Sequence, residues 1–157
     1  FKHENLYWNY RLSGIQASLG ISQLEDIDKT INFKIKQGNK YIELFKDYLD
    51  LFQLPLRESN GSINHFWVFG VVLKKENIRD KIINKLFDKG IETRPFFWPL
   101  HLQPALEKYS IKSNNLKLEV CEQLGKNGLY IPLGRHINFK DQEYIVKSLV
   151  DSVRTNN

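Results

Sequence analysis

The sequence contains no methionine and a single cysteine, Cys121, in 157 residues. One cysteine cannot form a disulfide within the chain, which favours a reducing compartment, and we expect a cytoplasmic protein. The chain begins at Phe1 rather than at methionine, so we expect it to be part of a longer protein. The longest apolar stretch, residues 66–73, is far shorter than the roughly 20 residues that a membrane helix needs. The sequence also shows no signal-peptide core, and we expect no membrane partner.

Neither the positive nor the negative charges cluster along the sequence. The formal net charge is +5, which on its own is compatible with nucleic acid or with a phosphorylated ligand. The cations alternate with acids, as in the stretch from Lys34 to Asp47, and this pattern is typical of a solvated helix face. We therefore expect no nucleic-acid partner. One cysteine and scattered histidines also predict no metal site.

Apolar periodicity predicts two helices in the first third of the chain. Ser13 is placed to cap a short helix over residues 12–24. A longer helix follows, with apolar residues at spacings of three and four, a weak point at Gly38 and an end at Pro55. Its apolar positions are Leu24, Ile27, Ile31, Ile35, Ile42, Phe45, Leu49 and Phe52.

Short strands and helices alternate in the remainder. Residues 59–62 (SNGS) predict a turn, residues 65–73 a buried strand, and residues 78–86 a helix that Gly90 would terminate. A strand over 91–94, a helix over 116–124 and a strand over 129–131 follow, and Asn138 with Asp141 predicts a capping box for a last helix. The fold class is α/β: two N-terminal helices, then a small sheet packed with helices. We predict a helical segment over residues 1–54 and a small α/β domain over 55–157.

Residues 95–104, PFFWPLHLQP, form a segment of a different kind. Three prolines in ten residues exclude a regular helix and a central strand. A rigid loop that carries aromatic side chains and one histidine is either a packed connector or one wall of a ligand site.

Three blocks resemble the DegT/DnrJ/EryC1/StrS family of sugar aminotransferases. Residues 8–25, WNYRLSGIQASLGISQLE, are similar to a family run that contains Tyr-Asn-x-Arg and Gln-Leu-Glu. Residues 90–104 resemble the family segment Gly-Ile-x-Thr-Arg before Pro-x-His-x-Gln-Pro, in a variant similar to perosamine-synthase-like members. Residues 128–134, GLYIPLG, resemble the strand before the last helix. Tyr7 and Ser18 depart from the family pattern.

This resemblance implies the small C-terminal domain of a fold-type I transferase that uses pyridoxal 5′-phosphate (PLP) and forms a homodimer. The family's Schiff-base lysine lies in a large domain upstream of the first block, so we expect no catalytic residue in this chain and no activity from it alone. The implied substrates are a nucleotide-linked keto-deoxysugar and an amino donor such as glutamate, in O-antigen, capsule or glycan synthesis.

The resemblance assigns Asn9 and Arg11 to the cofactor. The matching asparagine of the family reaches across the dimer to the PLP phosphate of the neighbouring subunit. An amide donates to a phosphate oxygen without adding charge, and a guanidinium presents forked donors to phosphate or carboxylate. The alternatives are a helix-capping role for Asn9 and a surface ion pair for Arg11.

The resemblance also places the proline segment beside the sugar nucleotide. We therefore expect Arg94, Phe96, Phe97 and His101 to bind substrate. Histidine can exchange a proton or bond a sugar hydroxyl, and aromatic rings can stack on sugar or base. The alternatives are a structural histidine and aromatic side chains that belong to the core.

Two other functions stay open at this stage. Some family members are sugar dehydratases, in which a histidine replaces the lysine, and the deciding position lies outside this chain. A non-catalytic dimerisation or nucleic-acid-binding module is the alternative from another class.

Overall fold

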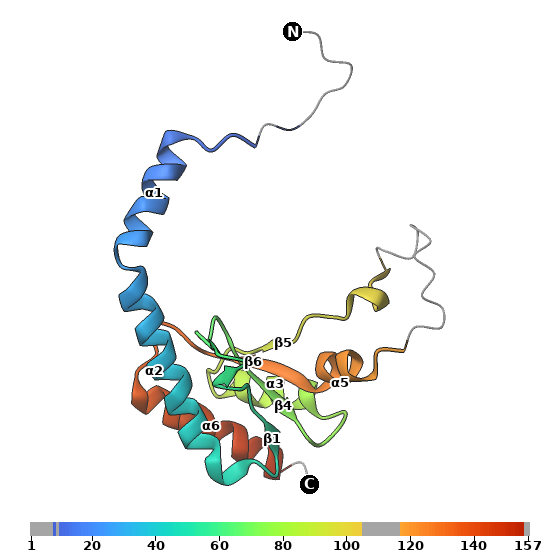
Figure 1. Cartoon of the computed structure of the whole chain (residues 1–157). Coiled ribbons are helices and arrows are strands. Elements are labelled where there is room, and N and C mark those ends of the chain that lie inside the picture. Colours follow the sequence, from blue (N-terminus) through green and yellow to red (C-terminus); the bar gives the residue numbers. More distant parts are fainter. Residues whose placement is uncertain (1–7, 9, 105–116, 156–157) are drawn as a thin grey trace.

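A helical arm leads into an α/β body in the computed structural model of the chain (Figure 1). The structure describes residues 8, 10–104 and 117–155. The arm consists of α1 (Gly14–Glu25) and the first half of α2 (Ile27–Phe45), and α1 buries no residue. The other elements, in chain order, are η1 (Lys46–Tyr48), β1 (Phe52–Gln53), β2 (Glu58–Ser59), β3 (Ser62–Ile63), β4 (Phe69–Leu73), α3 (Arg79–Asp88), β5 (Arg94–Pro95), η2 (Leu100–Leu102), α5 (Glu119–Asn127), β6 (Gly128–Ile131) and α6 (Phe139–Arg154).

A small antiparallel sheet with the strand order β1-β4-β6-β5 forms the centre of the body. In the central pair, Val71 lies opposite Leu129, and in the outer pair Arg94 lies opposite Tyr130. β5 lies at the edge of the sheet, which explains why it can contain Pro95. Proline has no backbone N–H to donate, so it is tolerated in a strand that pairs on one side only. β2 and β3 form a separate hairpin around Asn60 and Gly61, both with positive φ.

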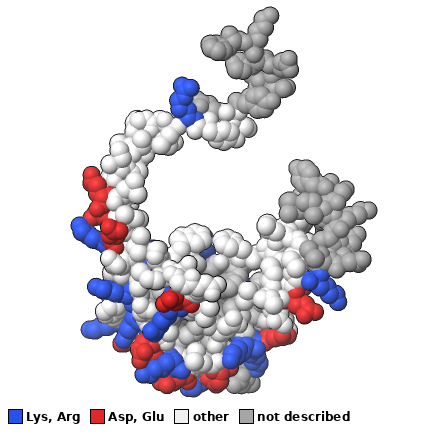
Figure 2. All heavy atoms as spheres, in the orientation of Figure 1, with Lys and Arg blue, Asp and Glu red and all other residues white. Residues whose placement is uncertain are grey.

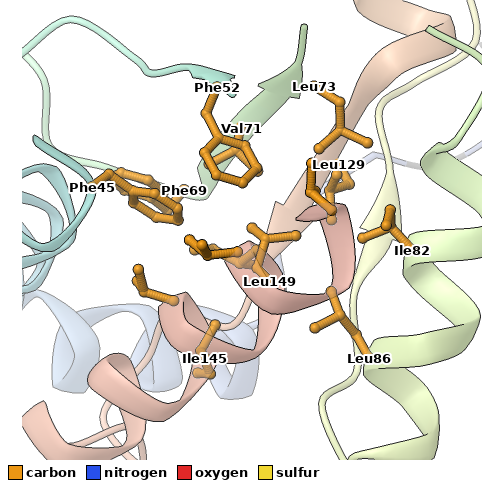
Figure 3. Packing of buried hydrophobic residues seen from close by; sticks show 14 of the residues in the cluster. Phe45, Phe52, Phe69, Val71, Leu73, Ile82, Leu86, Leu129, Ile145 and Leu149 are labelled. Carbon is orange, nitrogen blue, oxygen red and sulfur yellow. The ribbon is translucent and has the colours of Figure 1, made fainter. Parts of the chain in front are cut away.

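Three helices cover one face of this sheet, and Figure 3 shows the core between them. Alternate residues of β4 point into this core, where Phe69 is fully buried. Phe69 stacks on Phe45 of α2, with ring centroids 6.3 Å apart. α3 contributes Ile82 and α6 contributes Leu149, both fully buried. The opposite face of the sheet contacts α5 and the segment that follows β5.

Local capping signals are confirmed where the sequence placed them. Ser13 and Gln16 form a reciprocal capping box at the start of α1. Asn138 and Asp141 form a second capping box at the start of α6. Gly90 follows α3 with φ at +74°, a conformation that glycine adopts without steric cost. Each of these signals depends on residues no more than three or four positions apart, which explains why sequence alone locates them.

The second helix ends earlier than predicted, and one strand begins later. α2 ends at Phe45 rather than near Pro55, because Phe52 pairs with Leu73 and enters the core as part of β1. The strand expected from residue 65 begins at Phe69, because Phe66 has φ at +50° and interrupts an extended chain. The strand expected over 91–94 is β5, at residues 94–95. The predicted boundary between a helical segment and an α/β domain at residues 54/55 stays a prediction. β1, which precedes that boundary, lies in the same sheet as β4.

Buried polar side chains hold the second half of α2 against the segment 132–137. Gln37 donates from Nε2 to the carbonyl oxygens of Gly134 (2.8 Å) and Ile137 (2.7 Å). Tyr41 donates its hydroxyl to the carbonyl of Pro132 at 2.7 Å. Gln142 of α6 donates to the Gln37 carbonyl at 2.9 Å. We call these contacts the α2 clamp; they join α2, α6 and the chain between β6 and α6.

Gly38 belongs to the same contact region. A Cβ atom placed on Gly38 would lie 2.2 Å from the ring of Phe66, well inside van der Waals contact. The glycine that the sequence marked as a weak point in the helix therefore admits an aromatic ring. Phe66 is almost fully buried and stacks on Phe69, with ring centroids 5.8 Å apart.

We predict that Gly38→Ala lowers the free energy of unfolding by about 1–3 kcal/mol, because the added methyl overlaps a ring that the core holds in place. Urea denaturation measures this difference. Gly20→Ala is the matched control, because it lies within α1 with nothing within 4 Å of the new methyl. Equal stabilities of the two variants would contradict the predicted contact.

Burial raises the pKa of Tyr41 well above its usual range. The unfolded chain ionises this tyrosine near pH 10 while the folded chain keeps it protonated, so its contribution to stability is lost as pH rises above about 10. We predict that the wild type loses up to about 1.4 kcal/mol per pH unit more than Tyr41→Phe in that range.

Denaturation at pH 8 to 11 measures this slope. The control is Tyr144→Phe, since Tyr144 also donates to a backbone carbonyl, that of Lys89 at 3.1 Å, but is 52% exposed. Parallel pH profiles for the wild type and Tyr41→Phe would refute the predicted linkage.

Candidate functional site

The N-terminal motif lies at the outer end of the arm. Trp8 and Tyr10 are 85% and 88% exposed, and Arg11 is also exposed. Asn9 lies outside the described residues. No charged residue occurs from Leu12 to Leu24, and Figure 2 shows a stretch of the arm without charged side chains. Arg11, the cation predicted to bind a phosphate, therefore lies N-terminal to the uncharged part of the arm.

The segment after β5 is anchored by Phe96, which enters a slot on the face of the sheet away from the helical core. The Phe96 ring stacks on Tyr130 with centroids 4.7 Å apart. A Cβ atom added at Gly70 or Gly128 would lie 2.6 Å or 2.4 Å from this ring. Two glycines on neighbouring strands thus make room for one aromatic side chain. Phe96, predicted to bind substrate, is half-buried and fixes the start of the loop.

The next two aromatic residues are more exposed. Phe97 is 73% exposed and meets Tyr130 edge-on, with centroids 5.9 Å apart. Trp98 donates from its indole nitrogen to the Leu102 carbonyl at 3.0 Å, and Gln103 donates to the Trp98 carbonyl at 3.3 Å. These two bonds close the turn around η2. Phe97 thus remains available to a ligand, while Trp98 helps to hold the loop.

His101 packs against α5. Its side chain is 8% exposed, and its Nε2 lies 3.1 Å from Oε1 of Glu122, whose side chain is 28% exposed. The hydrogen bond with His101 and the Leu118 amide lower the pKa of Glu122 below its usual range, so Glu122 is a carboxylate at neutral pH. His101 and Glu122 therefore form a carboxylate–imidazole pair at the rim of the body.

Arg94 lies on the edge strand β5, with a side chain that is 79% exposed. Its guanidinium is 3.3 Å from Glu92, whose side chain is also exposed, so water screens this ion pair and it contributes little to stability. The position suits a ligand-facing cation better than a structural one.

An open groove of about 730 Å³ runs between the Phe96 segment and α5. Phe96, Phe97 and Tyr130 form one wall, and Leu118, Val120 and Leu124 form the other. This volume lies within the range of small-molecule sites. The fixed aromatic wall results from the glycine slot that holds Phe96.

The structure brings some predicted site residues together and separates others. Arg94, Phe96, Phe97 and His101 share the region around β5, η2 and α5, whereas Arg11 precedes α1, which projects away from that region (Figure 1). The described residues therefore fit one wall of a PLP site: exposed cations and a rigid aromatic loop, without a closed cradle for the phosphate.

Sequence reasoning missed Glu122 and Tyr130. Glu122 follows His101 by 21 positions, and no periodic signal links residues so far apart. Tyr130 was assigned to a strand only, although the side-chain alternation of β6 places it opposite the core and under Phe96. Within the described ranges, no group of three or more potential metal ligands occurs, and no helix is long and apolar enough to span a bilayer.

The chain is similar to known sugar-modifying enzymes in sequence. It is 29% identical over 148 residues to GDP-perosamine synthase of Escherichia coli O157:H7, which covers 94% of this chain and 38% of that enzyme. It is 33% identical over 116 residues to GDP-perosamine synthase of Vibrio cholerae, covering 71% and 30%. The chain thus spans about two fifths, or less, of the length of these relatives.

Solved structures share the fold. PseC of Helicobacter pylori, an aminotransferase involved in the biosynthesis of pseudaminic acid, superposes with a TM-score of 0.80 at 20% identity, over 98% of this chain and 41% of that one. DesV of S. venezuelae superposes with a TM-score of 0.80 at 21% identity, over 98% and 40%. The α/β fold predicted from the sequence, the small domain of a fold-type I transferase, is confirmed.

The sequence model of one protein family matches a region that contains both the N-terminal motif and the proline loop. It matches residues 1–150, from the arm through the proline loop to α6. The chain therefore belongs to the DegT/DnrJ/EryC1/StrS aminotransferase family.

Proposed function

We propose that this chain is the C-terminal part of a PLP-dependent enzyme that transfers an amino group to a keto group of a nucleotide-linked deoxysugar. Pyridoxal phosphate is the cofactor that the family and its solved members indicate. When bound, it supplies the electron sink that stabilises a carbanion next to the transferred nitrogen. The Schiff-base lysine belongs to the large domain that the relatives carry in the length outside this match.

One observation carries the proposal: α1, which follows Arg11, projects away from the body that holds the predicted substrate loop (Figure 1). Helix α1, the outer part of the arm, buries no residue against the described part of its own chain. The arm therefore reaches a second subunit, where Asn9 and Arg11 hold the cofactor phosphate. The proline loop forms the substrate side of the site. This arrangement supports a homodimer with composite sites.

Each residue has a defined task in this arrangement. Arg11 binds an anionic oxygen of the cofactor or of the substrate diphosphate. Arg94 supplies a second exposed cation, and Phe97 supplies a flat apolar face for the sugar or base. His101 hydrogen-bonds a sugar hydroxyl from a loop that Phe96 and Trp98 fix in position. Preformed geometry of this kind lowers the entropy that substrate binding loses.

A sugar dehydratase is the second candidate. The chain is 28% identical over 134 residues to GDP-4-keto-6-deoxy-D-mannose 3-dehydratase of Escherichia coli O55:H7. Nothing in the proline loop separates the two reactions, because the deciding lysine or histidine lies outside this chain. The product distinguishes them.

We predict that the complete protein, loaded with PLP, transfers the amino group of glutamate to a nucleotide-linked 4-keto-6-deoxysugar, and that residues 1–157 alone do not. Mass spectrometry of the sugar nucleotide measures the outcome. An amino sugar supports the transferase. A product that has lost a hydroxyl without gaining nitrogen identifies the dehydratase instead. An unchanged substrate with intact PLP binding would contradict both the aminotransferase and the dehydratase.

We predict that Arg11→Ala in the complete protein weakens PLP retention or raises the KM for the sugar nucleotide by about 10- to 100-fold, since a hydrogen bond to a charged group contributes about 1.5–3 kcal/mol. PLP absorbance during dialysis and initial rates measure the two effects. Lys29→Ala is the matched control, because it removes one positive charge from the same arm, where Lys29 pairs with Asp26 at 2.7 Å. Identical behaviour of both variants would exclude a ligand role for Arg11.

A further inference from the structure

The outer face of the sheet, opposite the helical core, presents polar side chains beside the groove. Arg94 of β5 lies directly opposite Tyr130 of β6, and Tyr130 lies opposite Gly70 of β4. Side chains of directly opposed residues project from the same face of a sheet. Leu129 and Ile131, the neighbours of Tyr130 along β6, are buried in the core. Arg94 and Tyr130 therefore both project from the outer face.

A second pocket, of about 380 Å³, lies between β5 and the connection from β6 to α6, and we call it the β5–α6 pocket. Tyr130 lines both this pocket and the groove beside α5, and no other residue of the described part of the chain lines both. The volume of the pocket falls within the range of small-molecule sites. One aromatic ring therefore borders two hollows, and their chemical character differs.

The polar side chains of the β5–α6 pocket include Glu92, Arg94 and His136. Arg94 and Glu92 form an ion pair at 3.3 Å, but their side chains are 79% and 74% exposed, so water screens the pair. His136 is exposed and has no hydrogen-bond or ion-pair partner among the residues that the structure describes. The neighbouring Arg135 does not line the pocket and donates instead to the hydroxyl of Thr30 on α2. Arg94 and His136 are therefore the donors that this pocket offers to an anion.

The backbone that carries these two donors is held by hydrogen bonds. Gln37 of the α2 clamp donates to the carbonyls of Gly134 and Ile137, which lie on either side of His136 in the sequence. The Ile137 amide also donates to the Gly134 carbonyl at 3.0 Å and closes this turn. Arg94 is held by the pairing of β5 with β6. An anion can therefore bind without the cost of ordering the main chain around it.

The chemistry of the two hollows indicates the class of ligand. A guanidinium presents forked N–H donors to phosphate or carboxylate, and an imidazole has an N–H donor in either tautomer. A bound oxyanion must compete with Glu92 for Arg94, and an ion pair as exposed as this one contributes little stability. The groove on which Tyr130 also borders offers an apolar, aromatic wall. A ligand that joins an oxyanion to a flat ring, such as a nucleoside diphosphate, fits both hollows, whereas the amino donor has no ring.

We propose that the β5–α6 pocket is a phosphate subsite, in which Arg94 and His136 bind one phosphate group of a nucleoside diphosphate while the base or sugar lies against Tyr130 in the groove. The inference deepens the proposed function and rests on it for the source of the nucleotide, which is the sugar-nucleotide substrate. His136 lies outside the three sequence blocks that resemble the family, so no motif marks it as a ligand residue.

Titration of the 157-residue chain with guanosine diphosphate at constant ionic strength, followed by the backbone amide signals in NMR spectra, tests the subsite. We expect saturable shifts at the amides of the pocket and of the groove. Arg94→Gln and His136→Gln should each raise the Kd by about tenfold, the effect of losing a hydrogen bond to a charged group. Lys140→Gln is the matched control, because it removes one positive charge at the start of α6 without lining the pocket. Equal Kd values for the three variants, or no saturable shift in the wild type, would overturn the proposal.

A gain of binding provides a second test that a misfolded variant cannot imitate. Glu92→Gln removes the carboxylate that competes with the phosphate for Arg94. We expect a Kd about two- to fivefold lower than that of the wild type, in keeping with the strength of an exposed ion pair. An unchanged or higher Kd in a variant with wild-type amide dispersion would contradict the subsite.

Two further probes distinguish the source of the oxyanion. Inorganic phosphate should compete with guanosine diphosphate and shift the amides of the pocket but not those of the groove. Glutamate that reproduces the pocket shifts, while guanosine diphosphate does not, would overturn the phosphate assignment. The titrations need neither PLP nor amino transfer. Lack of transfer by the complete protein would therefore refute the proposed function and leave the subsite intact, whereas equal Kd values would refute the subsite alone.

Discussion

The α2 clamp is the contact on which the rest of this structure depends. Four hydrogen bonds from Gln37, Tyr41 and Gln142 join α2 to α6 and to the segment 132–137. All three side chains are at least 99% buried, so the bonds are protected from competing water. Because α2 continues outward from this point into the arm, the clamp also sets the direction in which the N-terminal motif projects.

The proposed site draws on two separate parts of the chain. On one side the arm carries exposed aromatic and cationic groups beyond a helix with no charged residue from Leu12 to Leu24. On the other side Phe96, in its glycine slot, and the His101–Glu122 pair hold the proline loop against the sheet and α5. Sites that need several groups in fixed places gain from supports as well packed as this loop. Family membership agrees with this division, because the matched region extends over both supports.

Several elements could be predicted from neighbouring residues alone, and others could not. The helix cap at Ser13, the capping box at Asn138 and the glycine after α3 were located correctly, since each depends on a short stretch of chain. The end of α2 was placed wrongly, because Phe52 has the spacing of a helical residue but pairs with Leu73 in the sheet. Phe66 was assigned to a strand, whereas its ring fills the space beside Gly38.

The sequence by itself determined the α/β class, because the spacing of apolar residues is a local signal, and its resemblance to a known family implied the family and the cofactor and named the residues of the two motifs. The tertiary structure decided that Phe96 anchors the loop, that Glu122 bonds His101, and that Arg11 lies apart from both. The physical reason is distance along the chain. Contacts between α5 and the proline loop, or between Gly38 and Phe66, arise only when packing brings remote segments together, and no local pattern encodes which partners will meet.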